Sequence, residues 1–242
     1  MSDPRAFWSS QSSSLNQSAD MGFYSRKAGE HAALMSPEER SAGCVDLGCG
    51  AGEMLQFLAD DVNVKVGLDF SESMLAAARE ALGTRDIELT SADAFGYLAT
   101  TEVPVWTTTG AMNQYLPAKD LKRLVSIFFD NPAARSLFLF DCIDPLRYRL
   151  MSLGISYRAN YAVRRGSLTQ REKLAHFYHR VRYAAALSLG MFDGDVQWLG
   201  SPAMGYAVAP HFWHRVSASA ISVEIVSSRY YEYRYHAILR KK

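Results

Sequence analysis

Short apolar runs alternate along most of the chain with segments that have helical periodicity. The runs are apolar throughout, which is typical of strands buried on both faces of a parallel sheet. We expect strands at residues 43–47, 64–68, 87–90, 103–108 and 136–142, and helices at 21–35, 53–59, 71–82 and 118–129. Elements in this order predict a doubly wound α/β sheet with right-handed crossovers.

The alternation stops after the fifth strand and resumes near the C-terminus. A long helical stretch is expected at about 169–189, and a helix at 210–220 precedes two strands at 221–228 and 232–239. These two strands are close enough along the chain to form an antiparallel hairpin. We therefore expect a seven-stranded, mostly parallel sheet with a C-terminal antiparallel hairpin and a helical insertion after the fifth strand.

Length and composition suit one such domain with an insertion. The chain has 242 residues, of which 48% are hydrophobic and 21% charged. The Ser-rich N-terminus lacks the apolar core of a secretory signal, and no apolar run is long enough to cross a bilayer. Cys44, Cys49 and Cys142 are odd in number and lack CxxC spacing, so we expect reduced thiols and a cytoplasmic protein.

Charge is unevenly distributed although the formal net charge is only +1. Residues 145–190 hold nine Lys and Arg residues against the single acid Glu172. Such an excess could attract an anionic partner, or it could be a solvated helical face. Because aromatic side chains interleave with the arginines, a nucleic-acid substrate also stays open.

The run VDLGCGAG, residues 45–52, ends the first expected strand and precedes a helix. Glycines at this point let the backbone turn sharply and approach a ligand closely. Glu53 stands where a dinucleotide-binding fingerprint has its third glycine, and a carboxylate there disfavours a pyrophosphate. Asp69 closes the second strand at the spacing of an acid that binds ribose hydroxyls. The pattern predicts a nucleoside ligand without a pyrophosphate.

The residues of this region resemble a known enzyme family. VDLGCGAGEML and GLDFSESMLAAAR are similar to motifs I and II of the class I, Rossmann-like S-adenosylmethionine-dependent methyltransferases, and TSADAF and TTTGAMNQYL resemble the segments after their third and fourth strands. The likeness covers residues 43–144 well and 210–242 moderately. It implies S-adenosylmethionine as cofactor and methyl transfer as the reaction.

The resemblance also assigns a division of the chain. It implies an N-terminal helical cap at residues 1–40 and an S-adenosylmethionine-binding core at 41–144. A substrate-side insertion or lid at 145–209 and the end of the core at 210–242 follow.

Cofactor-binding residues are implied position by position. The matching segments contain Asp46, Gly48, Cys49, Gly50 and Gly52 around the methionine part, Asp69 at the ribose, Phe70, Ala92, Asp93 and Ala94 around the adenine, and Thr109 with Gly110 beneath the sulfonium. Two of these acids have structural alternatives. Asp46 could simply hold the glycine loop, and Asp93 could be a helix N-cap.

Tyr24 and Arg26 lie where many family members place a helix that closes over the cofactor's carboxylate. The arginine fork suits a carboxylate, although an exposed arginine on a helix is an equally good explanation.

Several methyltransferase subclasses do not fit. The sequence has TGAMNQ instead of the N/D-PP-Y tetrapeptide of base-amino enzymes, and Thr109 instead of the acid of metal-dependent catechol-type enzymes. Cys142 lacks the Pro-Cys context of cytosine-C5 enzymes. We expect an O-, N- or C-methyltransferase that acts on a small polar or anionic acceptor, as a monomer or homodimer.

The catalytic base cannot be assigned from the sequence. His211, His214 and Tyr178 are the candidates. No metal site is expected, because the helically spaced pairs His176/His179 and His211/His214 have no acidic third ligand nearby. Two alternatives to the small-molecule enzyme stay open. One is an RNA or DNA methyltransferase, and the other is a regulatory protein that binds S-adenosylmethionine without catalysis.

Overall fold

The computed structural model describes residues 21–110, 112–152, 195–199 and 204–242. Its centre is a seven-stranded sheet in the order β3-β2-β1-β4-β5-β9-β8. The strands are β1 (Cys44–Leu47), β2 (Val64–Asp69), β3 (Glu88–Ser91), β4 (Val105–Thr107), β5 (Ser136–Ile143), β8 (Ile221–Ser227) and β9 (Arg234–Lys241). The first five are parallel, and β9 runs antiparallel to both β5 and β8. The predicted sheet and C-terminal hairpin are confirmed.

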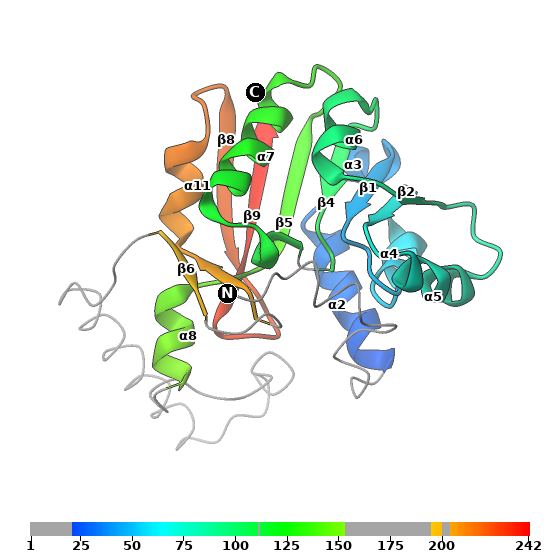
Figure 1. Ribbon diagram of the computed structural model, residues 1–242, viewed down its shortest axis with the longest axis horizontal. Helices are drawn as coiled ribbons and strands as arrows, with labels where there is room; N and C mark the ends of the chain where they lie inside the picture. The colour runs from blue at the N-terminus through cyan, green and yellow to red at the C-terminus, as the bar shows by residue number, and fades with distance from the viewer. Residues whose placement is uncertain (1–20, 111, 153–194, 200–203) are drawn as a thin grey trace.

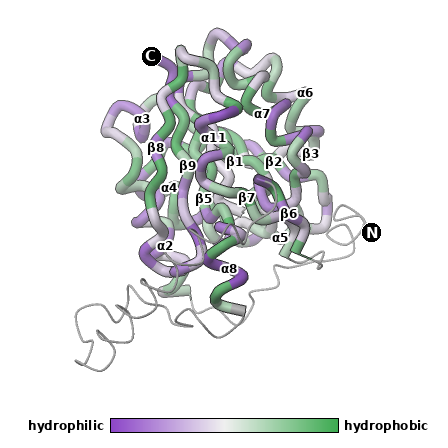
Figure 2. The backbone as a smooth tube through the Cα atoms, turned by 90° about the vertical axis from the view of Figure 1, so that its left-hand side faces the viewer, coloured by the Kyte–Doolittle hydropathy of each residue, from purple (hydrophilic) through white to green (hydrophobic). Residues whose placement is uncertain are grey.

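Helices cover both faces of the sheet (Figures 1 and 2). They are α2 (Met21–Ala33), α3 (Pro37–Ser41), α4 (Leu55–Asp61), α5 (Glu72–Leu82), α6 (Ala94–Thr100), α7 (Ala118–Asp130), α8 (Pro145–Ser152) and α11 (Pro210–Val216), with the 3₁₀ turn η1 (Met112–Tyr115). One apolar core joins the sheet to α6, α7 and α11. The other joins the opposite face to α2, α4 and α5.

The strand β5 shows why its sequence is apolar without alternation. Leu137 and Leu139 belong to the core beneath α7, whereas Phe138 and Phe140 belong to the core beneath α2 and α4. Because successive side chains of a strand point to opposite faces, both faces of this strand must be apolar. All eight of its residues are buried.

Local signals fix several helix ends. The Ser71 hydroxyl accepts a hydrogen bond from the Met74 N–H, as predicted for the N-cap of α5. At α3, Ser36 and Glu39 form a reciprocal capping box. Helix α3 was not expected, because five residues are too few to establish a helical period.

The segment after β5 differs from expectation. It contains β6 (Val196–Trp198) and β7 (Tyr206–Val208), which form a separate antiparallel pair. Strands of three residues leave no readable hydrophobic pattern, so this ribbon was missed. The helix expected at 210–220 ends at Val216, and the one expected at 169–189 lies outside the described residues.

Among the residues that the structure describes, no helix is long and apolar enough to cross a membrane. All three cysteines of the chain are buried and unpaired, in agreement with the expectation of free thiols.

Tyr235 joins the hairpin to α11 and to β7 by two buried hydrogen bonds. Its hydroxyl accepts from Trp213 Nε1 at 2.8 Å and donates to the Val208 carbonyl at 2.8 Å. Tyr235→Phe leaves both partners buried and unsatisfied, so we expect the free energy of unfolding to fall by about 1–3 kcal/mol. Urea denaturation measures the change. Tyr97→Phe, on the half-exposed ring of α6, is the matched control, and an equal loss in both variants would contradict the assignment.

Candidate functional site

A glycine-rich loop leaves the carboxyl end of β1. Gly48, Gly50 and Gly52 all have positive φ angles, of 68°, 56° and 80°, a conformation that glycine adopts without steric cost. The Cys49 N–H donates to the Leu68 carbonyl, which ties the loop to β2. A Cβ atom at Gly50 would meet no atom within 4 Å, so the backbone is open to a ligand there.

The turn after β4 packs against this loop. A Cβ atom on Gly110 would lie 1.8 Å from the Gly48 carbonyl oxygen, and one on Gly48 would lie 2.8 Å from Met112 Cβ. Glycine at both positions is therefore a steric requirement. The two segments that the sequence placed around one ligand do meet.

Asp46 connects these two segments. Its buried carboxylate accepts hydrogen bonds from the Thr109 N–H at 2.8 Å, the Thr109 hydroxyl at 2.5 Å and the Thr107 hydroxyl at 2.8 Å. Burial raises the pKa of Asp46 to about 6, although these hydrogen bonds oppose the rise. The contacts give Asp46 the structural role that the sequence left as an alternative.

Asp69 lies at the end of β2, beside the glycine loop. Its carboxylate accepts from the Gly50 N–H at 3.0 Å and from the Ser71 N–H at 2.9 Å. Burial raises its pKa, which the backbone hydrogen bonds oppose. A carboxylate has about four acceptor positions, so Asp69 retains the capacity to accept from ligand hydroxyls.

The residues expected around an adenine follow β2 and β3. Phe70 has a 44% exposed ring, which is unusual for a large apolar side chain. Asp93 caps α6 by accepting from the Gly96 N–H at 3.0 Å, and Ala92 and Ala94 flank it half-buried. The N-cap alternative for Asp93 is therefore present in the structure, and its contact with a cofactor stays a prediction.

Solved methyltransferase structures share this fold. CalS10, an amino pentose methyltransferase from Micromonospora echinaspora, has a TM-score of 0.53 at 14% identity, with 93% of this chain and 92% of that one covered. DesVI from Streptomyces venezuelae has 0.52 at 14%, with 90% and 92% covered. A SAM-dependent methyltransferase from Archaeoglobus fulgidus has 0.51 at 12%, with 93% and 95% covered. A comparison with curated proteins found no match.

A family model described as a methyltransferase domain matches residues 44–130, which run from β1 through α7 and contain the whole glycine loop. The chain therefore contains a methyltransferase domain and shares the fold of solved S-adenosylmethionine-dependent methyltransferases. The resemblance drawn from the motifs is thus confirmed.

Cys49 lacks the surroundings of an activated thiol nucleophile. Its side chain is buried in the glycine loop, and burial raises the pKa of its thiol well above the usual value. Its side chain packs in the apolar cluster with Met54, and its contact with a cofactor stays a prediction.

Helix α2 of the methyltransferase lies against α4 (Figure 1). Tyr24 is buried in the same apolar cluster as Cys49 and Met54 of the glycine loop and the turn that follows it. Arg26 is exposed, and its carbonyl accepts a hydrogen bond from the Tyr230 hydroxyl. The structure thus brings Tyr24 toward the expected site, whereas the Arg26 side chain points to solvent.

The candidate bases are less well supported by their surroundings. His211 lies 2.7 Å from Asp195, which also pairs with Arg215, so its contacts link α11 to the β6 ribbon. His214 is exposed in the last turn of α11. Tyr178 lies outside the described residues. The catalytic base stays unassigned.

A buried polar cluster beneath α2 was not anticipated. Lys27 and His31 of α2 face Asp141 of β5, and the His31 ring stacks on Phe140 at 3.8 Å between centroids. His236 of β9 completes the cluster, with Nε2 3.3 Å from Glu30 Oε1. The one signal in the sequence is an acid at the end of an otherwise apolar strand.

His31, Asp141 and His236 have the residue types of a metal site, and their ligand atoms lie within 4.8 Å of one another. The tautomer of His236 argues against this use. Its Nδ1 accepts from the Asp141 N–H at 3.2 Å, so its proton is on Nε2, facing Glu30. A ligating histidine normally donates through its second nitrogen. We therefore assign no metal to this cluster.

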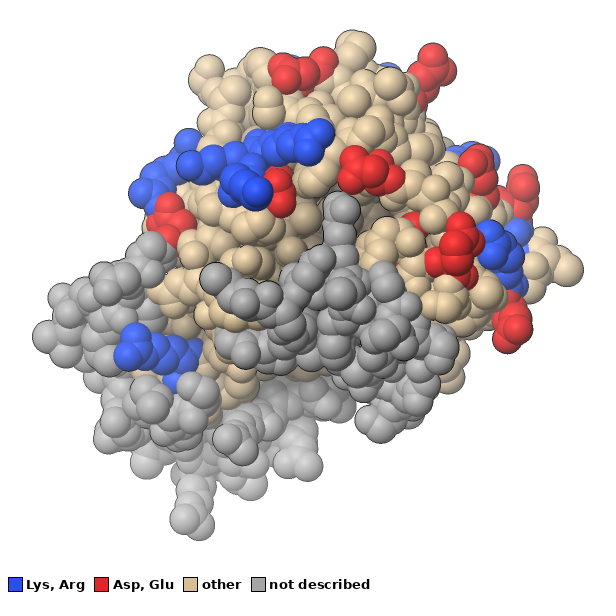
Figure 3. Space-filling model, in the orientation of Figure 1, with Lys and Arg blue, Asp and Glu red and all other residues tan. Residues whose placement is uncertain are grey.

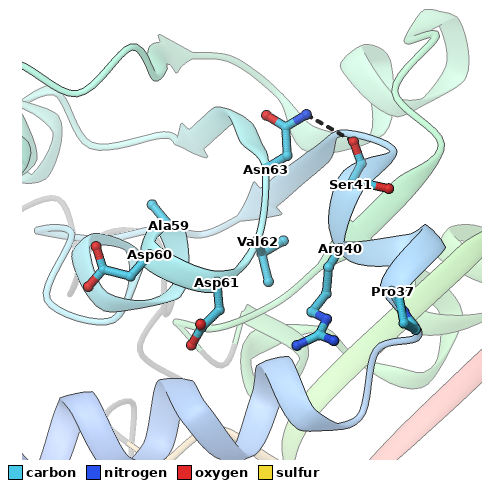
Figure 4. A pocket seen from close by; sticks show the side chains of 8 residues that line it. All are labelled: Pro37, Arg40, Ser41, Ala59, Asp60, Asp61, Val62 and Asn63. Atoms are coloured by element: carbon cyan, nitrogen blue, oxygen red, sulfur yellow. Dashed lines mark hydrogen bonds between the residues drawn. The ribbon is translucent and has the colours of Figure 1, made fainter.

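A shallow hollow of about 450 Å³ lies at the opposite edge of the sheet (Figure 4). It is bounded by α3 and by the end of α4, where the Asn63 amide donates to the Ser41 carbonyl. The hollow borders the amino ends of β1 and β2, away from the glycine loop. It is not the cofactor site.

Asp69→Asn tests the expected ribose contact. Hydrogen bonds to a charged group contribute about 1.5–3 kcal/mol, so we expect S-adenosylhomocysteine to bind roughly 10- to 150-fold more weakly by calorimetry. Asp61→Asn is the matched control, because Asp61 is exposed at the far edge of the sheet. Unchanged affinity in Asp69→Asn would refute the assignment.

Because His31 is buried, we expect the free energy of unfolding to decrease in mild acid. Burial holds its pKa well below 6.5, so the native state keeps it neutral while the unfolded chain takes up a proton as the pH falls through 6.5. Between pH 7.5 and 5.5 this costs the native state about 1.4 kcal/mol.

The variant His31→Phe keeps an aromatic ring stacked on Phe140. Between pH 7.5 and 5.5, its free energy of unfolding, measured by urea denaturation, should fall by about 1.4 kcal/mol less than that of the wild type. The titration of Asp46 is common to both proteins and cancels in the difference. Equal losses in the two proteins would show that His31 does not remain neutral.

Proposed function

We propose that this methyltransferase binds S-adenosylmethionine at the glycine loop and methylates a small polar acceptor. One observation carries the assignment of the site. The Gly50 backbone is open on one side, and its N–H is held by the carboxylate of Asp69, which can also accept from ribose hydroxyls. A diphosphate would be repelled by this carboxylate and by Glu53.

In this proposal a different group of residues contacts each part of the cofactor. Asp69 accepts from the ribose hydroxyls, and the exposed ring of Phe70 lies along the adenine. Asp93 and the Ala94 N–H, at the start of α6, meet the adenine edge. The loop from Asp46 to Gly52 and the Thr109–Gly110 turn surround the methionine part and the sulfonium.

Methyl transfer requires no covalent bond between the protein and either reactant. A lone pair of the acceptor attacks the methyl carbon, and the electrons of the carbon–sulfur bond return to sulfur, which yields S-adenosylhomocysteine. The chain aligns the two reactants and excludes water. A proton of the acceptor leaves to a base that we do not assign.

The acceptor site is expected at the carboxyl edge next to β4 and β5, beneath the substrate-side lid at 145–209. Strand β7 of this lid packs on η1, where a Cβ atom at Gly205, next to the strand, would lie 2.0 Å from the Gln114 carbonyl oxygen. The N-terminal cap at 1–40 supplies α2. The bounds of the lid and of the cap are part of this proposal.

The size and the charge proposed for the acceptor rest on different observations. CalS10, which has the same fold, is an amino pentose methyltransferase. Anionic character of the acceptor rests on the arginines of residues 145–190, most of which lie outside the described residues.

Described basic residues add little to the argument for an anionic acceptor. Arg147 is engaged by Asp144 and by the Glu232 carbonyl. Figure 3 shows other basic side chains over α7 and α11, on a helical face of the molecule. Such a face is more often solvated than a binding surface.

Calorimetry with S-adenosylhomocysteine tests the cofactor, and we expect saturable binding of one molecule per chain with no uptake of NAD. Release of S-adenosylhomocysteine from S-adenosylmethionine is then measured with amino sugars, phosphorylated and carboxylated metabolites, and an RNA oligonucleotide. Turnover with a small acceptor supports the proposal. Turnover with the RNA alone overturns the acceptor class, and binding without turnover across the panel favours a regulatory protein.

A further inference from the structure

The Asp141 carboxylate reaches α2 only because β5 departs from regular geometry. Asp141 has φ +56°, and the pairing of β5 with β9 shifts register between Leu139 and Cys142. Strict alternation would place residue 141 on the same face as Leu137 and Leu139. Instead Cys142 rejoins that core, and Asp141 lies with Phe140 on the α2 side. The bulge thus turns the Asp141 carboxylate toward α2.

This arrangement is costly in isolation. A non-glycine residue at positive φ is disfavoured, although Asp tolerates it better than most residues. The Asp141 side chain is fully buried, and that of Lys27 is 9% exposed. The Lys27 ammonium contacts Asp141 Oδ2, so each charge is compensated by the other.

Glu30 provides a second connection one turn away. Its Oε1 accepts from the Arg229 N–H at 2.5 Å and lies 3.3 Å from His236 Nε2. Helix α2 is therefore joined by charged groups to β5, to β9 and to the turn before β9.

A buried ion pair is a poor source of stability, because an apolar pair of similar size is often as good or better. Its specific effect is to fix which residues face each other. The α2 face against α4 includes the small residues Ala28 and Ala32, which alone would permit neighbouring registers. The Lys27–Asp141 contact disfavours these registers, because each of them separates the buried Lys27 ammonium from Asp141 and leaves Arg234 as the remaining buried guanidinium near that carboxylate.

We propose that Lys27 and Asp141 are a positioning pair, which fixes the register of α2 so that Tyr24 is held against the glycine loop where the cofactor binds. Tyr24 precedes Lys27 by three residues, and it shares an apolar cluster with Cys49 and Met54. This inference rests on the proposed binding of S-adenosylmethionine at that loop.

The test uses the full chain and S-adenosylhomocysteine as probe. Lys27→Met with Asp141→Asn removes both charges together, and Asn also tolerates positive φ. We expect a urea midpoint near that of the wild type and at least tenfold weaker binding of the probe, with faster amide hydrogen exchange at residues 21–33. Lys65→Met, at an exposed site on β2, is the control. Binding within twofold of the wild type overturns the proposal.

Two further variants keep the test decisive if the double variant fails to fold. Lys27→Arg retains the ion pair and should bind the probe within threefold of the wild type, whereas Lys27→Gln should lose at least tenfold. Equal affinities overturn the proposal.

A double-mutant cycle shows whether the pair acts through Tyr24. The effects of Tyr24→Leu and Lys27→Gln on affinity should be smaller together than their sum. Additive effects overturn the route through Tyr24. If the wild type itself ignores S-adenosylhomocysteine, the proposed function fails instead.

Discussion

The Asp46 carboxylate is fully buried, and the loops around it are arranged to satisfy it. Three donors from Thr107 and Thr109 converge on its two oxygens, so the end of β4 is bound to the end of β1. With that link in place, Gly110 comes into contact with the Gly48 carbonyl, and neither residue has room for a side chain. The position of the glycine loop, and therefore the shape of the proposed cofactor site, depends on this contact.

The parallel sheet explains why so many of the candidate site residues meet at one edge. The carboxyl ends of β1, β2 and β4 deliver Asp46, Asp69 and Thr109 side by side, although they are far apart in the sequence. Ligands of doubly wound folds bind at this edge for the same reason. The open hollow at the opposite edge is lined mainly by residues of α3 and α4, and although Asp60 and Asp61 are among them, no glycine lines it.

Buried charged groups also fix the position of helix α2 on the sheet. Apolar packing alone can hold a helix on a sheet, but it tolerates small shifts that a binding site does not. The bulge at Asp141 and its ion pair with Lys27 add little to stability, but they define the position of α2. Buried polar contacts thus fix the positions of the glycine loop and of α2, whereas apolar contacts make up most of the two cores.

The sequence by itself determined the sheet, its order of elements and the glycine loop, because apolar runs, N-caps such as Ser71 and glycines at positive φ are local properties of the chain. It also indicated Asp69 through its spacing from the loop. Only the tertiary structure decided that Asp46 serves Thr107 and Thr109, that His211 is engaged by Asp195, and that a bulge turns Asp141 toward Lys27. These outcomes depend on which segments become neighbours after folding, and no local pattern encodes that pairing.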